Sequence, residues 1–190
     1  MISDITGVIL AGGKSSRMGR NKALLPFRGR PLIETIRDTM SSIFNKVVIS
    51  VHQENAYPQI DLLQIPDLYP ETGPIGGITS VLQSGEERIF CVACDMPFLN
   101  RELIEYLAGL ADCDAVIPIW REKIEVLHAF YSFALLAQLK TCLKSGRFRI
   151  TDALGEAHVR YIQEPEIRPL DPQGLSFRNI NVPSDFEEIA

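Results

Sequence analysis

VILAGGKSSRMGRNK, residues 8–22, joins a short apolar run to a glycine-rich turn that carries three cations. The apolar run predicts the end of a buried strand, of the kind found in parallel sheets. Gly12 and Gly13 have no Cβ, so the backbone there can pass close to a ligand and direct consecutive N–H groups at a phosphate. Arginine can bind phosphate oxygens bidentately, and lysine supplies a mobile point charge. The cations are Lys14, Arg17 and Lys22, and the stretch therefore predicts a polyphosphate site.

Two other interpretations compete for this stretch. A solvated surface loop with ordinary basic residues would have a similar composition. A P-loop is suggested by Gly13, Lys14 and Ser15, which spell GKS. That motif needs a second glycine five positions before the first residue of GKS, where this chain has Val8. The P-loop interpretation therefore fails on spacing, and the solvated loop stays as the alternative.

Apolar patterns on the rest of the chain predict strands that alternate with helices. Strands are expected at residues 46–51, 62–66, 88–94, 115–119, 126–133 and 159–162, and helices at 31–43, 78–83, 100–110, 135–144 and 184–189. Asn100 is expected to cap a helix and Gly146 to end one. Loops are expected at 69–77 and 164–174, a hairpin turn at 120–123, and a cap at Thr151 and Asp152. We therefore expect one domain over residues 1–190, a three-layer α/β fold whose mostly parallel sheet has helices on both faces.

Composition narrows the class of protein. The chain of 190 residues is 46% hydrophobic, which suits a single domain with a sizeable core. Its net charge of −5 argues against general nucleic-acid binding. No apolar run is long enough for a membrane span, and no basic segment marks a signal peptide, so we expect a cytoplasmic protein. Cys91 and Cys94 form a CxxC inside a strand, where an offset of three puts them on opposite faces, which predicts free thiols.

Polar residues that follow predicted strands are candidates for a ligand crevice, because open α/β sheets bind ligands at the carboxyl ends of their strands. His52 and Asp67 follow the second and third strands. Asp95 follows the long apolar strand 88–94, where an ionised carboxylate needs hydrogen bonds or a cation. Mg²⁺ bound with a triphosphate takes only one or two carboxylates, so Asp95 alone could serve. The alternative is that Asp95 is a turn residue or a helix cap.

Residues 10–22 resemble the signature of the molybdenum cofactor guanylyltransferases, LAGG-x-S-x-R-M-G-x-x-K. Related cytidylyltransferases of the same pathway usually carry LAAG, so the resemblance favours guanine. It also implies the nucleotide-diphospho-sugar transferase-like form of the Rossmann-like fold. The fixed positions are met by Leu10, Ala11, Gly12, Gly13, Ser15, Arg17, Met18, Gly19 and Lys22.

The resemblance implies roles for residues elsewhere in the chain. A GP-x-x-G loop would lie under the guanine base, the Asp before it would contact the nucleotide, and the CDMP segment would bind metal through Asp95. His128 would face the pterin, unless it is a packed or hydrogen-bonded strand residue, and the chain would end in N-x-N-x-P-x-(D/E). The positions that match are Asp67, Gly73, Pro74, Gly76 and Gly77 for the loop, and Asn179, Asn181, Pro183 and Asp185 for the end. Arg149 belongs to a small cationic group with Lys144 and Arg147 that could meet a phosphorylated acceptor, unless it is a solvated surface.

The expected reaction is Mg²⁺-dependent transfer of GMP from GTP to the phosphate of the molybdenum-bearing pterin, with release of pyrophosphate. Arg17, Lys22 and Asp95 are the expected catalytic residues. The expected partners are GTP, the pterin, and proteins of cofactor synthesis or molybdoenzyme maturation, with no nucleic acid and no membrane. The alternatives are a related transferase that uses CTP or a sugar-phosphate acceptor, and a nucleotide-binding module without catalysis.

Overall fold

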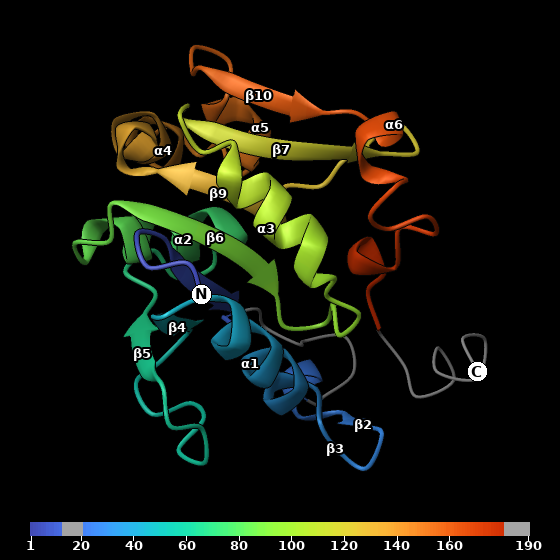
Figure 1. The fold of residues 1–190 in the computed structure, drawn as a ribbon. Coiled ribbons are helices and arrows are strands. Elements are labelled where there is room, and N and C mark those ends of the chain that lie inside the picture. Colours follow the sequence, from blue (N-terminus) through green and yellow to red (C-terminus); the bar gives the residue numbers. More distant parts are fainter. Residues whose placement is uncertain (13–20, 181–190) are drawn as a thin grey trace.

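A computed structural model describes residues 1–12 and 21–180 of the chain (Figure 1). An eight-stranded mixed sheet runs in the order β10-β7-β9-β6-β1-β4-β5, and β8 pairs with β7 at its side. Its strands are β1 (Thr6–Leu10), β4 (Val47–Val51), β5 (Leu63–Pro66), β6 (Arg88–Ala93), β7 (Ala115–Trp120), β8 (Lys123–Ile124), β9 (His128–Ser132) and β10 (Val159–Ile162). A separate small hairpin joins β2 (Pro26–Phe27) and β3 (Arg30–Pro31).

The register of the sheet brings the predicted strand ends together. β1 pairs in parallel with β4 and β6, and β4 pairs in parallel with β5. Leu10, the last residue of β1, lies opposite Ser50 in β4 and Ala93 in β6. β9 is antiparallel to both β6 and β7. The prediction of a mostly parallel sheet is confirmed, and the segments after β1, β4, β5 and β6 all leave the same edge.

Helices cover both faces of this sheet, as predicted. In Figure 1, α1 (Leu32–Ile43) and α3 (Arg101–Gly109) lie in front of the sheet, and α2 (Pro74–Gln83) lies behind it. The apolar faces of α1 and α3 enter one core cluster with Phe90 and Val92 of β6. The other cluster joins Ile89 and Cys91 of β6 to α2, α4 (Leu136–Lys144) and α5 (Ile150–Ala153). β6 is therefore buried on both faces, which explains its continuous apolar sequence.

Several local predictions are also confirmed. The side chain of Asn100 accepts a hydrogen bond from the backbone N–H of Leu103 and so caps α3. Gly146 has φ +69° just after α4, the left-handed conformation that ends many helices. Cys91 and Cys94 belong to opposite core clusters, and all four cysteines are free. None of the helices in residues 1–12 and 21–180 is long and apolar enough to cross a membrane.

Other local predictions are wrong in their boundaries. Residues 74–77 form the first turn of α2 and not a loop, because Pro74 occupies the first turn, where proline is favoured. The segment 164–174 begins with a helix, α6 (Glu164–Ile167), held by a capping box between Gln163 and Glu166. Thr151 and Asp152 lie inside α5 and do not cap it. The predicted strand 126–133 pairs only as β9 from His128, and the predicted helix 184–189 lies outside the described residues.

Three short 3-10 helices complete the described chain. They are η1 (Lys22–Leu24), η2 (Phe133–Leu135) and η3 (Leu175–Phe177). η1 follows the glycine-rich stretch directly, and η3 lies on the segment that returns to the end of β6. The backbone N–H of Ile180 donates to the carbonyl oxygen of Asp95 at 2.7 Å. This contact joins the last described residue to the turn after β6.

Candidate active site

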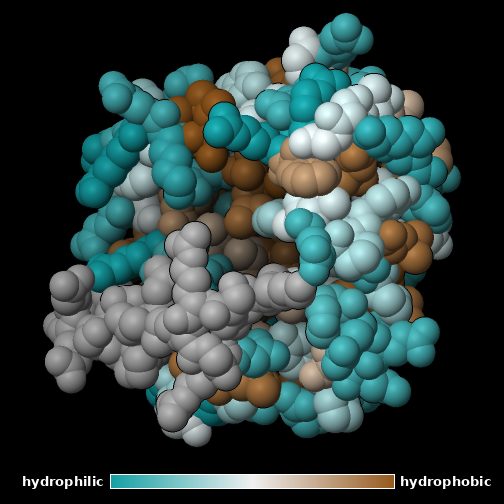
Figure 2. All heavy atoms as spheres, turned by 180° about the vertical axis from the view of Figure 1, so that it is seen from behind, coloured by the Kyte–Doolittle hydropathy of each residue, from teal (hydrophilic) through white to brown (hydrophobic). Residues whose placement is uncertain are grey.

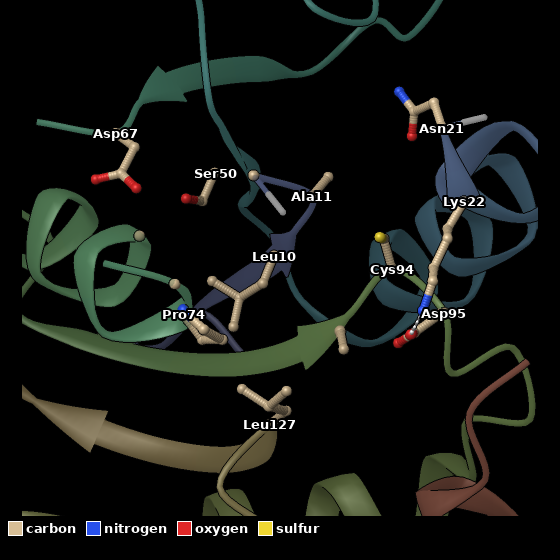
Figure 3. A pocket seen from close by; sticks show the side chains of 14 residues that line it. Leu10, Ala11, Asn21, Lys22, Ser50, Asp67, Pro74, Cys94, Asp95 and Leu127 are labelled. Carbon is tan, nitrogen blue, oxygen red and sulfur yellow. Dashed lines mark ion pairs between the residues drawn. The ribbon is translucent and has the colours of Figure 1, made fainter. Parts of the chain in front are cut away.

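A pocket of about 200 Å³ lies at the edge of the sheet where the parallel strands end (Figure 3). Its lining comes from the ends of β1, β4, β5 and β6, from the first turns of η1 and α2, and from the segment before β9. On the face seen in Figure 2 the surface is hollowed, with hydrophobic atoms at the floor and hydrophilic atoms on the rim. The lining residues are Leu10, Ala11, Gly12, Asn21, Lys22, Ser50, Asp67, Gly73, Pro74, Gly77, Ala93, Cys94, Asp95 and Leu127.

The backbone places Gly12 at the pocket. The sheet hydrogen bonds continue one residue past the end of β1, because Ala11 donates to the carbonyl oxygen of Ser50 at 2.9 Å. Cys94 likewise donates to the carbonyl oxygen of Leu10 at 3.1 Å. Gly12 therefore leaves the sheet between the ends of β4 and β6, with its peptide group next to the pocket. This is the location that the sequence predicted for the start of a phosphate-binding turn.

Lys22 and Asp95 face each other across one end of the pocket (Figure 3). The Nζ atom of Lys22 lies 3.7 Å from Oδ2 of Asp95, and their side chains are 37% and 16% exposed. Burial raises the pKa of Asp95, and the charge of Lys22 opposes that rise. Asn100 caps α3, so the helix-cap alternative for Asp95 is excluded, and its carboxylate is left to face the pocket.

A buried hydroxyl group fixes the two segments that carry Gly12 and Lys22. Tyr57 is 1% exposed, and its hydroxyl donates to the carbonyl oxygen of Ala11 at 3.2 Å. The hydroxyl oxygen of Tyr57 also accepts a hydrogen bond from Nδ2 of Asn21 at 3.1 Å. Oδ1 of Asn21 in turn accepts from the backbone N–H of Ala23 and caps η1, which begins at Lys22. Burial raises the pKa of Tyr57 to about 12, so the hydroxyl stays protonated at neutral pH.

Asp67 and the start of α2 form the other end of the pocket (Figure 3). Oδ1 of Asp67 accepts from the backbone N–H of Tyr69 at 2.8 Å and from the hydroxyl of Ser80 at 3.2 Å. These bonds hold the carboxylate against the side of α2. Within the described part of the chain Oδ2 of Asp67 accepts no hydrogen bond. Burial raises the pKa of Asp67, while the nearby charge of His52 lowers it.

Two glycines let α2 approach the strands closely. A Cβ atom on Gly77 would lie 2.6 Å from Oγ of Ser50, and one on Gly76 would lie 2.9 Å from Oδ1 of Asp67. Cβ atoms do not approach neighbours so closely, so a side chain on Gly77 would push α2 off the sheet, and one on Gly76 would clash with the segment 67–72. The glycines after Pro74 are thus needed to bring the N-terminus of α2 to the pocket.

The donor set fits one Mg²⁺ ion that a triphosphate also ligates. Residues 1–12 and 21–180 contain no group of three or more His, Cys, Asp or Glu side chains that could hold a metal by themselves. A triphosphate-bound Mg²⁺ needs only one or two carboxylates. Asp95 supplies one carboxylate at the pocket, mostly buried and 3.7 Å from the Nζ atom of Lys22.

The structure gathers about half of the residues predicted for the site. Leu10, Ala11, Gly12, Lys22, Asp67, Gly73, Pro74 and Asp95 line the pocket, as does Gly77. Gly76 is buried directly behind it in α2. His52 is exposed and lies near Asp67 without lining the pocket. Arg149 is exposed at the start of α5, away from the lining. Gly13, Lys14, Ser15, Arg17 and Asn181 lie outside the described residues.

His128 corrects one of the acceptor predictions. Its side chain is 0% exposed, and its ring packs edge-on against Phe90 and Phe177 with centroids 5.4 and 5.3 Å apart. Burial lowers its pKa to about 4, although nearby Asp171 opposes this. His128 cannot reach an acceptor without leaving the core, so it is a packing residue. Asn179 differs, because its Oδ1 atom is buried and accepts no hydrogen bond from the residues that the structure describes.

The sequence prediction missed five lining residues. Ser50 is the polar member of an otherwise apolar strand end, and its place opposite Leu10 could have been found from the sheet register. Asn21 stands directly before Lys22 and has the residue type of a helix cap. Cys94 is the first residue of the CDMP segment, which marked the site although only Asp95 was assigned a role. Ala93 and Leu127 carry no signal in the sequence, since small and apolar residues at strand ends are common.

Comparisons with known proteins agree with this geometry. Residues 7–159 match the family model described as the MobA-like NTP transferase domain. A molybdenum cofactor guanylyltransferase from Desulfosudis oleivorans is 36% identical, over 97% of this chain and 93% of the relative. The crystal structure of molybdopterin-guanine dinucleotide biosynthesis protein A from Archaeoglobus fulgidus has a TM-score of 0.85 at 28% identity, covering 97% of this chain and 96% of that one. A cytidylyltransferase from Thermus thermophilus, at 14% identity and a TM-score of 0.68, shares the fold alone.

Proposed function

Because this chain belongs to the family of MobA-like NTP transferases, we propose that it transfers GMP from GTP to the phosphate of the molybdenum-bearing pterin and releases pyrophosphate. The observation that carries the proposal is the ion pair of Lys22 and Asp95 in a pocket that Gly12 also lines. A cation for the triphosphate and a carboxylate for a metal thus lie together in the pocket where the backbone can approach phosphate.

The triphosphate lies along Gly12 and Lys22, and the base lies over the start of α2. The backbone N–H groups near Gly12 and the Nζ atom of Lys22 stabilise the charge that builds on the leaving pyrophosphate. Asp95 is the residue that would hold Mg²⁺, which supplies positive charge to the phosphate oxygens when bound. The acceptor phosphate attacks the α-phosphorus in line, and the protein contributes positioning and charge, with no covalent intermediate. Arg17 is proposed to add a bidentate contact to the phosphates.

Asp67 is proposed to contact the nucleoside. Its Oδ1 atom is held by Tyr69 and Ser80, and its Oδ2 atom is left to accept a hydrogen bond at the pocket. Pro74 and Leu10 line the same pocket and offer apolar surface to the base. The preference for guanine is supported by the LAGG sequence at residues 10–13 and by the names of the relatives.

The proposed setting is the cytoplasm, with delivery of the product to proteins of cofactor synthesis or molybdoenzyme maturation. The free thiols of Cys91, Cys94, Cys113 and Cys142 support a reducing compartment.

The test is an assay of pyrophosphate release with each of the four nucleoside triphosphates, Mg²⁺ and the pterin acceptor. We expect the highest kcat/KM with GTP, and no release when the acceptor is left out. A higher kcat/KM with CTP would contradict the guanylyl assignment. Release with a sugar phosphate and not with the pterin would contradict the acceptor.

A further inference from the structure

A second, larger pocket of about 630 Å³ lies between the β7–β8 hairpin and the segment 172–178. Trp120, Arg121, Lys123 and Glu125 line one wall, and the segment with η3 lines the other. The two walls are in firm contact, because Gly174 has φ +64° and a Cβ there would lie 2.1 Å from the indole of Trp120. The function proposed above uses none of these residues.

This second pocket opens on the same edge of the sheet as the nucleotide pocket. β6 and β7 both pair antiparallel with β9, so Asp95 after β6 and Trp120 at the end of β7 leave the sheet at one edge. Glu125 lines the second pocket and Leu127 lines the first. Their Cα atoms can be at most about 7.6 Å apart, since consecutive Cα atoms are about 3.8 Å apart.

A second segment joins the two pockets in the same way. Arg178 lines the second pocket, and Ile180 donates its backbone N–H to the carbonyl oxygen of Asp95 at 2.7 Å. The two residues are also two positions apart. A molecule that fills the second pocket is therefore near the nucleotide pocket at Leu127, and near Asp95 through Ile180, where an acceptor phosphate must arrive.

The lining has the charge that an anionic heterocycle requires. Glu125 is 4% exposed, and it is one of the residues that line the pocket. Nζ of Lys123 lies 3.0 Å from Oε1 and 3.2 Å from Oε2 of Glu125, and the side chain of Lys123 is 66% exposed. The exposed Lys123 ammonium group thus covers the buried Glu125 carboxylate. Hydrogen-bond donors of a ligand can take the place of Lys123. With Arg121 and Arg178, three cations and one carboxylate line a pocket in a chain of net charge −5.

We propose that this second pocket holds the pterin ring system of the acceptor. The two carboxylate oxygens of Glu125 accept from the 2-amino group and the adjacent ring N–H of the pterin, which present two parallel donors. Lys123, displaced from Glu125, and Arg121 then meet the anionic groups of the acceptor. The inference rests on the function proposed above, because it takes the acceptor to be a pterin.

Direct binding tests the inference without turnover. Pterin-6-carboxylate is fluorescent and anionic, and its titration with the whole chain gives a Kd. We expect saturable binding to the wild type and at least tenfold weaker binding to Glu125→Gln, because the amide presents a donor to the pterin amino group. Arg121→Gln should weaken binding about threefold through loss of charge. The matched controls are Glu156→Gln and Arg160→Gln, both exposed and outside the pocket, and they should bind within twofold of the wild type.

Several outcomes would overturn the inference. Equal binding to Glu125→Gln and wild type would do so, as would the absence of saturable binding to the wild type. Displacement of the probe by GTP would assign the pocket to guanine, whose edge offers similar donors. A thermal melt checks that Glu125→Gln is folded, and Arg121→Gln, in an exposed turn, tests the pocket if it is not.

The two proposals fail in different ways. If the proposed function is wrong, the wild type releases no pyrophosphate with GTP and the pterin acceptor. The titration with pterin-6-carboxylate then still shows whether the second pocket binds a pterin. If the pocket is wrong and the function is right, Glu125→Gln keeps the wild-type KM for the acceptor in the pyrophosphate assay.

Discussion

At the scale of single residues, the hydroxyl of Tyr57 connects the core to the catalytic pair. It joins Ala11 at the end of β1 to Asn21, and Asn21 caps the short helix that carries Lys22. The ring itself is packed in the core beside Ile60. A variant that removes only the Tyr57 hydroxyl should therefore leave the packing of the ring unchanged and affect only the positioning of Ala11 and Asn21.

The variant Tyr57→Phe should raise the KM for GTP about five- to tenfold, with kcat within twofold of the wild type. The magnitude is the net loss of about 1 kcal/mol when the hydrogen bonds of this hydroxyl with Ala11 and Asn21, which order Lys22 for binding, are removed. Steady-state kinetics measure it. Tyr106→Phe is the matched control, since it removes an exposed hydroxyl that bonds Glu166 at 3.1 Å far from the pocket. An unchanged KM in Tyr57→Phe would show that Lys22 is held in another way.

At the scale of elements, the close approach of α2 to β4 forms one side of the nucleotide pocket. Gly77 makes it possible, because Oγ of Ser50 occupies the space where a Cβ would lie. Ser50 itself is 1% exposed, so it has little room to move away. Adding one methyl group at Gly77 should therefore move α2 away from β4.

The variant Gly77→Ala should lose about 1–3 kcal/mol of unfolding free energy, the usual cost of overpacking, and should raise the KM for GTP. Urea unfolding and kinetics measure the two effects. Gly109→Ala, in α3, is the control, because nothing lies within 4 Å of the position that its Cβ would take and alanine favours a helix. Equal stability of Gly77→Ala and wild type would mean that α2 is not held as tightly as the distances indicate.

The elements also show what could be predicted from the sequence. Apolar patterns found the strands of the sheet and the helices that cover it, since burial on one or both faces leaves a local signature. They failed at 69–77, where prolines and glycines predicted a loop although Pro74 begins α2. They failed again at 164–174, where a short polar helix is held by its own capping box.

The candidate site was predictable only where a local motif or a strand end marks it. Gly12, Lys22 and Asp95 have such signals, and all three line the pocket. Ser50 and Leu127 enter it through strand pairing between segments far apart in the chain, and no local pattern encodes that pairing. The role of His128 stayed open between a pterin contact and packing, because a polar residue in a strand looks the same in sequence whether it faces a ligand or the core.

At the scale of the whole molecule, His128 makes stability depend on pH. It lies between Phe90 and Phe177, and neither ring nitrogen has a hydrogen-bond partner among the described residues. Burial lowers its pKa to about 4 from an ordinary value of 6.5. Between these values the unfolded chain binds the proton and the folded chain does not, so stability falls as pH falls through this window.

As the pH is lowered from 6.5 to 4, His128 should therefore decrease the unfolding free energy by up to about 1.4 kcal/mol per pH unit. His128→Leu should show a smaller decrease over the same window, because the residue no longer titrates. Urea unfolding at half-unit steps of pH measures both proteins. The same slope in both would mean that the histidine is protonated in the folded state and has a partner.

The central claim is that Asp95 holds the metal for nucleotidyl transfer, and a Mg²⁺ titration of pyrophosphate release tests it most directly. Asp95→Asn keeps the shape of the side chain and removes its charge. Asp112→Asn, on an exposed residue, is the matched control. We predict that Asp95→Asn melts near the wild-type temperature, is inactive at ordinary Mg²⁺ concentrations and needs far more Mg²⁺, while Asp112→Asn behaves as the wild type. Normal activity of Asp95→Asn at ordinary Mg²⁺ concentrations would contradict the account.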